Sequence, residues 1–295
     1  MKIKCIFKGF LKLAFLVIVM FMSLAVSSSI VGISSSSDAA NTSILPILAY
    51  SFMNTVIIAL FIANSRLNRI KLIAVTSLIF FSIQYFMTQI ETLYFNSAIN
   101  MPIKVIIKVI ISGALNSIIF STVAVIILGK FKKGLVVPIK NSSIPKPIAY
   151  MAILSIAYTF IYFIFGYFVA WQFSEIRVFY TGSSDILNMF NHLANVLRND
   201  TWLPLFQIFR GFLWAAIGLI IINSLAVKKS MEYLISSLLF SVLISSPLLF
   251  SNQYMPGAIR FGHFIELFTS MVLFGALSIF VKDKLMSSEK SNLSA

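Results

Sequence analysis

The sequence predicts an all-α fold, a polytopic transmembrane helix bundle of about eight spans with both termini in the cytoplasm. The 295 residues are 59% hydrophobic and only 11% charged, with a mean hydropathy of +0.96, whereas about a quarter of the residues of a soluble domain are charged. Apolar stretches recur that are as long as the roughly 20 residues a helix needs to cross a bilayer. Lysine and arginine gather in alternate connecting segments, which is the positive-inside pattern of membrane proteins.

The apolar stretches divide most of the chain between them. They cover residues 13–33, 44–64, 72–95, 109–128, 148–171, 203–223, 234–250 and 256–281. No hydrophilic segment between them exceeds about 30 residues, which leaves no room for a soluble catalytic or nucleotide-binding domain. Residues 1–295 are therefore expected to form a single integral membrane domain.

The first stretch follows an N-terminal segment with four lysines. Residues 1–27 resemble a signal peptide in charge and in the small residues near their end, but the uncharged run 13–33 exceeds the about 7 to 15 residues of a signal-peptide core. An uncleaved first span is therefore expected, with cleavage as the alternative. The polar segment 34–43 contains no lysine or arginine and is expected on the outer side.

The second to fourth stretches continue this alternation. Arg66, Arg69 and Lys71 mark a short internal loop, and a brief turn after the third stretch returns the chain from outside. Lys104 and Lys108, at the start of the fourth helix, are expected to extend their charged ends to the outer interface.

The second half of the chain alternates in the same way. Five lysines follow the fourth stretch, two follow the sixth and three follow the eighth, so that 17 of the 23 basic residues lie in segments predicted to be internal. The net charge of +14 therefore reflects topology, and nucleic acid is not an expected partner.

Two turns of similar sequence suggest an internal repeat. Residues 101–108 read MPIKVIIK before the fourth helix, and residues 255–263 read MPGAIRFGH before the eighth. Each has Met-Pro and then a basic residue or a histidine on the next helix. A weak duplication of four plus four spans, as in some transporters, is one interpretation.

Residues 172–201 form the one substantial external segment. Apolar residues recur between positions 186 and 197 at i, i+3, i+4 and i+7, which predicts an amphipathic helix. Ser184 is its candidate N-terminal cap. The helix is expected to lie in the membrane interface, with a role in covering a cavity as the alternative.

Several kinds of chemistry are not indicated by the sequence. Cys5 is the only cysteine, so no intrachain disulfide and no multi-cysteine metal site is possible. The chain has no P-loop, no HExxH and no GxSxG motif, and we expect no metal and no cofactor. The abundance of Lys, Ile, Ser and Asn favours a bacterial cytoplasmic membrane; in a eukaryote, residues 41–43 (NTS) would be a glycosylation acceptor.

The last stretch contains the strongest candidate site. Arg260, His263 and Glu266 follow one another at i, i+3 and i+6, so on a helix they share one arc. His263 would lie roughly 9 Å and Glu266 roughly 13 Å below the outer end of the span. Because an ionised group there costs about 3 kcal/mol or more, this arc is expected to face the protein interior or a watery cavity.

Other polar side chains are expected at a similar depth. Gln84, Thr88 and Glu91 lie at i, i+4 and i+7 on one narrow face of the third span, and Arg210 lies roughly 10 Å into the sixth. Together with the residues of the last span, they predict an outward-facing polar layer in the outer half of the membrane.

Each of these residues also has a structural interpretation. Glu91 could lie at the interface or pair with Lys108, Arg210 could form a buried salt bridge with Glu266 or Glu91, and Arg260 could extend to the interface. His263, Glu266 and Glu91 would provide only the minimum number of ligands for zinc, which takes three or four protein ligands in most sites.

Three functions remain open at this point. The first is proton-coupled binding or transport of a small anionic or lipid-derived ligand, with arginines holding the anion and His263 and Glu266 responding to protons. The second is an intramembrane enzyme that modifies a lipid, with Glu266 or Glu91 as base and His263 as acid. The third is a non-catalytic membrane protein that binds a partner. The lipid bilayer is an expected partner in all three, and the oligomeric state stays open.

Overall fold

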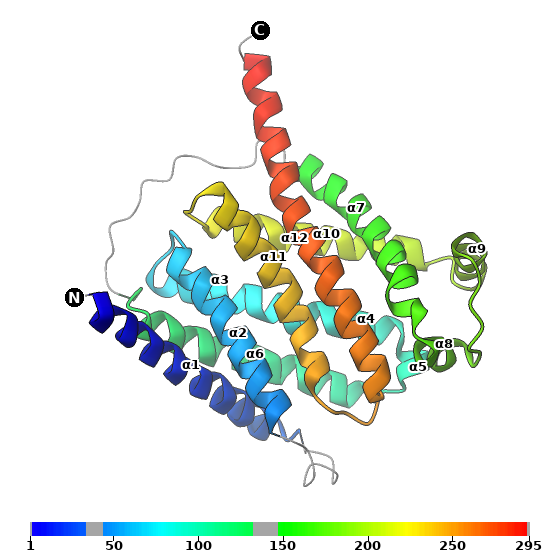
Figure 1. Cartoon of the computed structure of the whole chain (residues 1–295), viewed down its shortest axis with the longest axis horizontal. Coiled ribbons are helices and arrows are strands. Elements are labelled where there is room, and N and C mark those ends of the chain that lie inside the picture. Colours follow the sequence, from blue (N-terminus) through cyan, green and yellow to red (C-terminus); the bar gives the residue numbers. More distant parts are fainter. Residues whose placement is uncertain (1, 34–43, 132–146, 294–295) are drawn as a thin grey trace. The chain divides into compact units, whose positions relative to one another are not determined.

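The computed structural model describes residues 2–33, 44–131 and 147–293, with side chains over 7–33, 44–131 and 147–287. This part of the chain is helical and contains no β-strand beyond isolated bridges (Figure 1). Eight of its helices are long and apolar enough to cross a membrane, over the ranges Phe7–Val31, Leu45–Asn64, Arg69–Tyr94, Ile103–Ile127, Pro147–Gln172, Leu203–Ser224, Lys229–Leu249 and Gly257–Ser287. The all-α, multi-pass architecture is therefore confirmed, while the side on which each terminus lies stays a prediction.

The helices are named by their labels in Figure 1. They are α1 (Lys2–Val31), α2 (Leu45–Asn64), α3 (Arg69–Phe81), the π-helix η2 (Ser82–Phe86), α4 (Met87–Tyr94), α5 (Asn96–Ile99), α6 (Ile103–Ile127), α7 (Pro147–Phe168), the 3₁₀-helix η3 (Ala170–Gln172), α8 (Ser174–Thr181), α9 (Met189–Asn199), α10 (Leu203–Ser224), α11 (Lys229–Ser245), the 3₁₀-helix η4 (Ser246–Leu249) and α12 (Gly257–Leu293).

The chain divides into two compact units. Unit 1 comprises Met1–Pro138, Ser224–Lys228 and Val242–Pro256, and unit 2 comprises Ile139–Asn223, Lys229–Ser241 and Gly257–Ala295. The first four spans belong to unit 1, and the fifth, sixth and eighth belong to unit 2. Helix α11 contributes to both units. The repeat suggested by the two Met-Pro turns stays a prediction.

In unit 1, α6 is the helix around which the others pack. Helices α1 and α3 both lie along it, and α1 also packs against α2 (Figure 1). Gly113 allows the ring of Tyr85 to approach α6, since a Cβ at this glycine would lie 2.2 Å from the ring. Unit 1 also contains the short backbone pairing in which Arg66 N–H donates to the Ser224 carbonyl at 2.9 Å.

In unit 2, two glycines allow close helix approach. A Cβ at Gly211 of α10 would lie 2.6 Å from the Cα of Ser155 on α7, and a Cβ at Gly275 of α12 would lie 2.5 Å from the Cα of Ser237 on α11. Small residues at such crossings are typical of membrane helix packing, because dispersion contacts between close backbones stabilise it.

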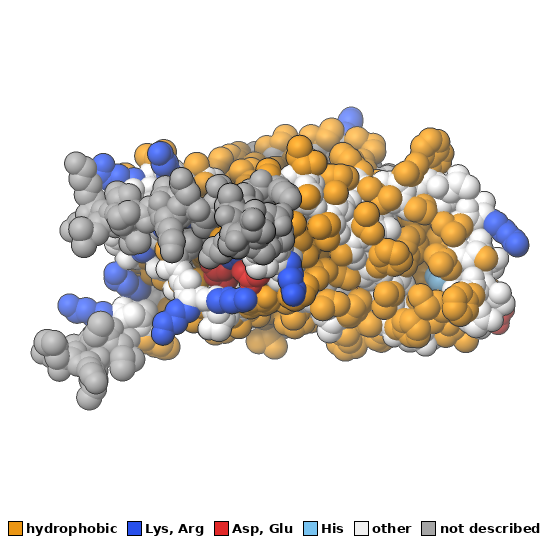
Figure 2. All heavy atoms as spheres, turned by 90° about the horizontal axis from the view of Figure 1, so that it is seen from above, with side chains coloured by type: hydrophobic (Ala, Val, Ile, Leu, Met, Phe, Trp, Pro, Cys, Tyr) orange, Lys and Arg blue, Asp and Glu red, His pale blue; other side chains and the backbone are white. Residues whose placement is uncertain are grey.

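The outer surface of the spans is apolar. On α7, for example, Ile153, Ile156, Phe160 and Ile164 recur at helical spacing and are all exposed, Phe160 by 64%. Hydrophobic side chains likewise cover much of the face shown in Figure 2. Exposed apolar surface on this scale is unfavourable in water and suits a hydrocarbon environment.

The structure differs from the sequence expectations in local detail. The third span contains a π-helical turn, and the external segment contains α8 as well as the predicted amphipathic helix. The predicted cap is wrong: Asn188, not Ser184, caps α9, its side chain accepting from Asn191 N–H at 2.9 Å. The loop 34–43 and the lysine-rich 132–146 lie outside the described residues.

Replacing Gly211 by alanine is expected to lower the free energy of unfolding by about 1 to 3 kcal/mol, because the new methyl group meets backbone atoms of Ser155. Gly166→Ala is the matched control, since nothing lies within 4 Å of its built Cβ and alanine favours helix by about 1 kcal/mol. Thermal unfolding in detergent, followed by circular dichroism, measures both. Equal melting temperatures for the two variants would contradict the proposed close crossing.

Candidate functional site

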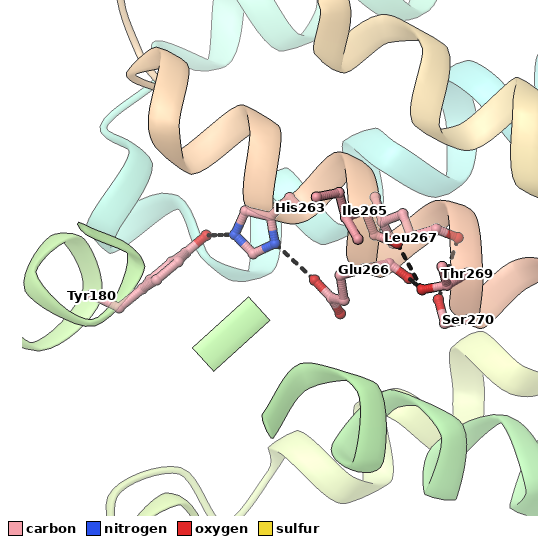
Figure 3. Close-up of polar contacts among 7 residues, drawn as sticks. All are labelled: Tyr180, His263, Ile265, Glu266, Leu267, Thr269 and Ser270. Carbon is pink, nitrogen blue, oxygen red and sulfur yellow. Dashed lines mark hydrogen bonds and ion pairs between the residues drawn. The ribbon is translucent and has the colours of Figure 1, made fainter. Parts of the chain in front are cut away.

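His263 and Glu266, one turn apart on α12, form a hydrogen-bonded pair (Figure 3). The imidazole Nδ1 lies 2.8 Å from the Glu266 carboxylate, and the hydroxyl of Tyr180 on α8 lies 3.3 Å from Nε2 on the other side of the ring. Gly262 brings α8 close, because a Cβ there would lie 2.6 Å from Ile176. The predicted juxtaposition of His263 and Glu266 is therefore present, with Tyr180 as a third member.

In this row of three side chains, Glu266 is more deeply buried than His263. The side chain of His263 is 20% exposed and that of Glu266 is 8% exposed. The hydroxyls of Thr269 and Ser270 donate to carbonyls of their own helix (Figure 3). Since an imidazole can take a proton on one nitrogen and give one from the other, His263 can connect the protein surface to a carboxylate in the protein interior.

Aromatic rings extend this row to the second histidine. Tyr180 lies over Trp171, with ring centroids 6.4 Å apart, and Trp171 lies 4.7 Å from the His192 ring of α9. Tyr167 packs on the same imidazole at 5.5 Å. Burial against these rings lowers the pKa of His192, because desolvation disfavours the charged imidazolium. The tertiary structure thus links both histidines of the chain.

Arg210 is completely buried in unit 2. Its Nη1 donates to Gln207 Oε1 at 3.0 Å, and its guanidinium carbon lies 5.7 Å from the ring centroids of Tyr158 and Phe206. The other end of the Gln207 amide, Nε2, is buried and has no hydrogen-bond partner among the described residues. The interior thus holds a guanidinium and, on the residue to which it donates, an amide N–H without a partner, and both kinds of group can donate to an anion.

One contact of Arg210 leads to a part of α12 that is distant from Glu266. Tyr158, beside the guanidinium, packs against Phe274 of α12 with ring centroids 5.7 Å apart. Phe274 follows Glu266 by eight residues, which is about 12 Å along a helix. A single polar layer containing Arg210 and Glu266 stays a prediction.

Unit 1 contains a separate, uncharged polar network. Seven buried side chains from five helical segments hydrogen-bond to one another in its interior. They are Ser23 (α1), Tyr50 and Asn54 (α2), Gln84 and Tyr85 (η2), Asn116 (α6) and Ser246 (η4).

Tyr50 and Tyr85 occupy the middle of this network. Their hydroxyls are 3.0 Å apart; Asn116 Nδ2 donates to Tyr85 at 2.7 Å, and Gln84 Nε2 donates to Tyr50. Each phenol oxygen thus accepts an amide N–H, and only one of the two phenol protons can lie between them.

At the other end of the network, around Ser246, there are more hydrogen-bond acceptors than protons to donate. Ser246 lies 3.1 Å from Asn54 Oδ1 and 3.4 Å from Gln84 Oε1, and its single proton can serve only one of these acceptors. A half-turn of the Gln84 amide would let Tyr50 donate to Gln84, and Gln84 to Ser246. The network therefore has two hydrogen-bond patterns that differ by one amide rotation.

Thr88 stabilises the π-helical turn that carries Gln84. Its hydroxyl donates to the carbonyls of Gln84 and Tyr85 at 2.8 and 3.0 Å, while Met87 N–H donates back to the Ser82 carbonyl. A π-helical turn leaves part of the i to i−4 ladder open, and such turns recur at functional sites. The position of Thr88 therefore indicates a role in backbone geometry.

The remaining candidates lie near these clusters in the chain. Glu91 is half-buried on α4 of unit 1 and Arg260 is half-buried on α12 of unit 2. The Lys108 ammonium donates to the Gly32 carbonyl at 2.7 Å, which gives this predicted interface residue a specific partner. Neither Glu91 nor Arg260 gains a role from these observations.

Apart from Gln84, the residues of the uncharged network were not among the candidates that the pattern of ionisable groups predicted. Asn54 and Asn116 gave the available signal, since each is an amide near the middle of an apolar span, where a polar group requires a partner. Tyr180 and His192 gave no such signal, because only the folding of the external segment brings Tyr180 to His263 and His192 to Trp171.

Comparison with known proteins adds no assignment. No family model, no curated protein and no solved structure matches this chain. Within the described residues, no group of three or more His, Cys, Asp or Glu side chains could hold a metal ion.

Tyr85→Phe is expected to lower the free energy of unfolding by about 1 to 3 kcal/mol, because the Asn116 amide and the Tyr50 hydroxyl lose a buried partner. In the double variant with Tyr50→Phe, the loss is expected to be smaller than the sum of the two single losses, since the partners are removed together. Denaturant titration of the four proteins measures this coupling. Strictly additive losses would show that the two phenols do not interact.

The packing of α9 on Trp171 is expected to weaken as the pH falls below about 6.5, because the undocked His192 binds a proton more readily than the docked one. Hydrogen exchange of α9 amides at about pH 7.5 and about pH 5.5, corrected for intrinsic rates, measures this change. His192→Phe keeps an aromatic ring and should abolish the pH dependence. Equal pH dependence in the two proteins would contradict the role of His192.

Proposed function

We propose that the chain is a proton-coupled membrane transporter for a small anionic ligand, with its proton site and its anion site both in unit 2. The observation that carries the proposal is the hydrogen bond between His263, whose side chain is 20% exposed, and the buried Glu266. A carboxylate inside a membrane protein is costly when ionised, so its retention beside an imidazole favours a function in binding protons.

The pair can change its charge without losing its hydrogen bond. A neutral imidazole can donate from Nδ1 to the ionised carboxylate, and an imidazolium can make the same contact. Binding of one proton therefore changes the net charge of the His263–Glu266 pair from negative to neutral. Tyr180, on Nε2, lies on the side from which that proton would arrive.

Arg210 and Gln207 supply the features expected of an anion site. Arginine in a buried position binds carboxylate or phosphate oxygens through a planar array of donors. Gln207 Nε2, buried beside it without a hydrogen-bond partner among the described side chains, adds a neutral donor. An anion bound here would offset the cost of burying the guanidinium, and coupled proton uptake would offset the charge that the anion brings.

Transport is tested in proteoliposomes that contain a pH-sensitive dye. Inorganic phosphate, lactate and succinate serve as probes, and internal acidification after the addition of each anion reports coupled uptake. Wild-type protein is expected to acidify the lumen with at least one of them. Glu266→Gln should reduce the initial rate by about tenfold or more, because the glutamine keeps the hydrogen bond but not the titrating proton.

Thr269→Val is the matched control on the same helix, because the Thr269 hydroxyl donates only to carbonyls of α12. It should leave the rate unchanged. Arg210→Gln should instead raise the anion concentration that gives half the maximal rate. Acidification that persists in Glu266→Gln would contradict the proton-coupling proposal. No response to any probe would favour a structural or partner-binding role for His263, Glu266 and Arg210.

A further inference from the structure

An apolar groove runs along the exposed surface of unit 1 between α3 and α6. Its volume is about 410 Å³, and eight residues line it: Ile70, Ile73, Ala74, Ser77, Leu78, Phe81, Ala114 and Ile118. The small residues Ala74 and Ala114 form its depression, while Ile70, Leu78 and Ile118 are large and exposed beside them.

The groove has the length of one bilayer leaflet. Its lining residues on α3 run from Ile70 to Phe81, which is about 17 Å at the helical rise of 1.5 Å per residue. A hydrocarbon core is about 30 Å thick, so this distance is close to half of it. The groove therefore extends from one membrane surface to about the bilayer centre.

Its width fits a single hydrocarbon chain. A volume of about 410 Å³ spread over about 17 Å gives a mean cross-section of about 25 Å². An α-helix about 10 Å across has a cross-section of about 80 Å². The body of a second helix is thus too wide to lie within the groove, whereas one acyl chain fits along its length.

Basic side chains lie where the groove meets the membrane surface. Arg69 and Lys71 flank Ile70 and are both exposed. Lys71 is three residues from Ala74 and seven from Leu78, so these three residues share one stripe of α3. The positive charge therefore lies at the surface end of the apolar groove, as phospholipid recognition requires.

The backbone at this end is held in an unusual conformation. Arg69 has a φ of 52°, in the left-handed region that favours glycine. Its N–H donates to the Lys130 carbonyl at 3.1 Å, and the Lys130 ammonium donates to the Ser65 carbonyl at 3.2 Å. Strained backbone of this kind is typical of binding sites, where the surrounding structure stabilises it.

We propose that this groove binds an anionic phospholipid, with the phosphate on Arg69 and Lys71 and one acyl chain along Ala74, Leu78 and Phe81. The lipid belongs to the leaflet that Arg69 faces, which the charge pattern predicts to be the cytoplasmic one. This site is in unit 1, and the proposed proton and anion sites are in unit 2, so the lipid proposal is independent of the proposed function.

Native mass spectrometry of the purified protein tests the proposal. Phosphatidylglycerol and phosphatidylcholine with identical acyl chains are the probes. We expect the protein to retain one phosphatidylglycerol under conditions that strip phosphatidylcholine. The double variant Arg69→Gln/Lys71→Gln should weaken this retention by about tenfold or more. Lys104→Gln, an exposed basic residue of α6, is the matched control and should retain the lipid.

Two further variants separate the groove from the charges. Ala74→Phe fills the groove and should lower phosphatidylglycerol retention while leaving Arg69 and Lys71 intact, and Lys71→Gln alone should weaken binding without altering the strained residue. Equal retention of both lipids, or unchanged retention in the double variant, would overturn the proposal. Loss of a dimer in Ala74→Phe, with lipid retention unchanged, would also overturn it, because the groove would then be a contact between two copies.

Discussion

The cost of burying a polar group away from water constrains this structure more than any other interaction. In a hydrocarbon environment water cannot compensate an open N–H, carbonyl or hydroxyl, and each such group costs several kcal/mol. Helices satisfy the backbone, so the remaining problem concerns side chains and helix irregularities. The π-helical turn at Ser82–Phe86 illustrates the solution, because Thr88 donates to two carbonyls of that turn.

The same constraint leads to different chemistry in the two units. Unit 1 contains only uncharged amides and hydroxyls in its described central network, so its polar core connects five helical segments without the cost of burying a charge. Unit 2 contains several buried ionisable side chains, namely Arg177, Arg210, Glu266 and Lys282. Charged groups are far more expensive than neutral ones in such surroundings, and for this reason the functional proposal rests on unit 2.

The external segment joins the histidines of unit 2 by packing. Tyr180 reaches His263 because α8 approaches α12 at Gly262, and His192 lies against Trp171 and Tyr167. These contacts combine a helix that sequence periodicity predicted, α9, with a short helix that it did not, α8. Helix α8 is only eight residues long, and so short a segment gives too few repeats for helical periodicity to predict it.

The sequence by itself determined the class of the protein and the positions of its spans, because length and apolarity are local properties and a helix is the only single-segment structure that satisfies its own backbone in a membrane. It also placed His263 beside Glu266, since residues three apart on a helix are neighbours wherever the helix lies. The tertiary structure alone decided which distant side chains meet. Ser23 and Asn116, or Asn54 and Ser246, lie on different segments, and their pairing depends on how helices rotate and pack. That rotation is set by close contacts such as Tyr85 on Gly113, which no periodicity along one helix encodes.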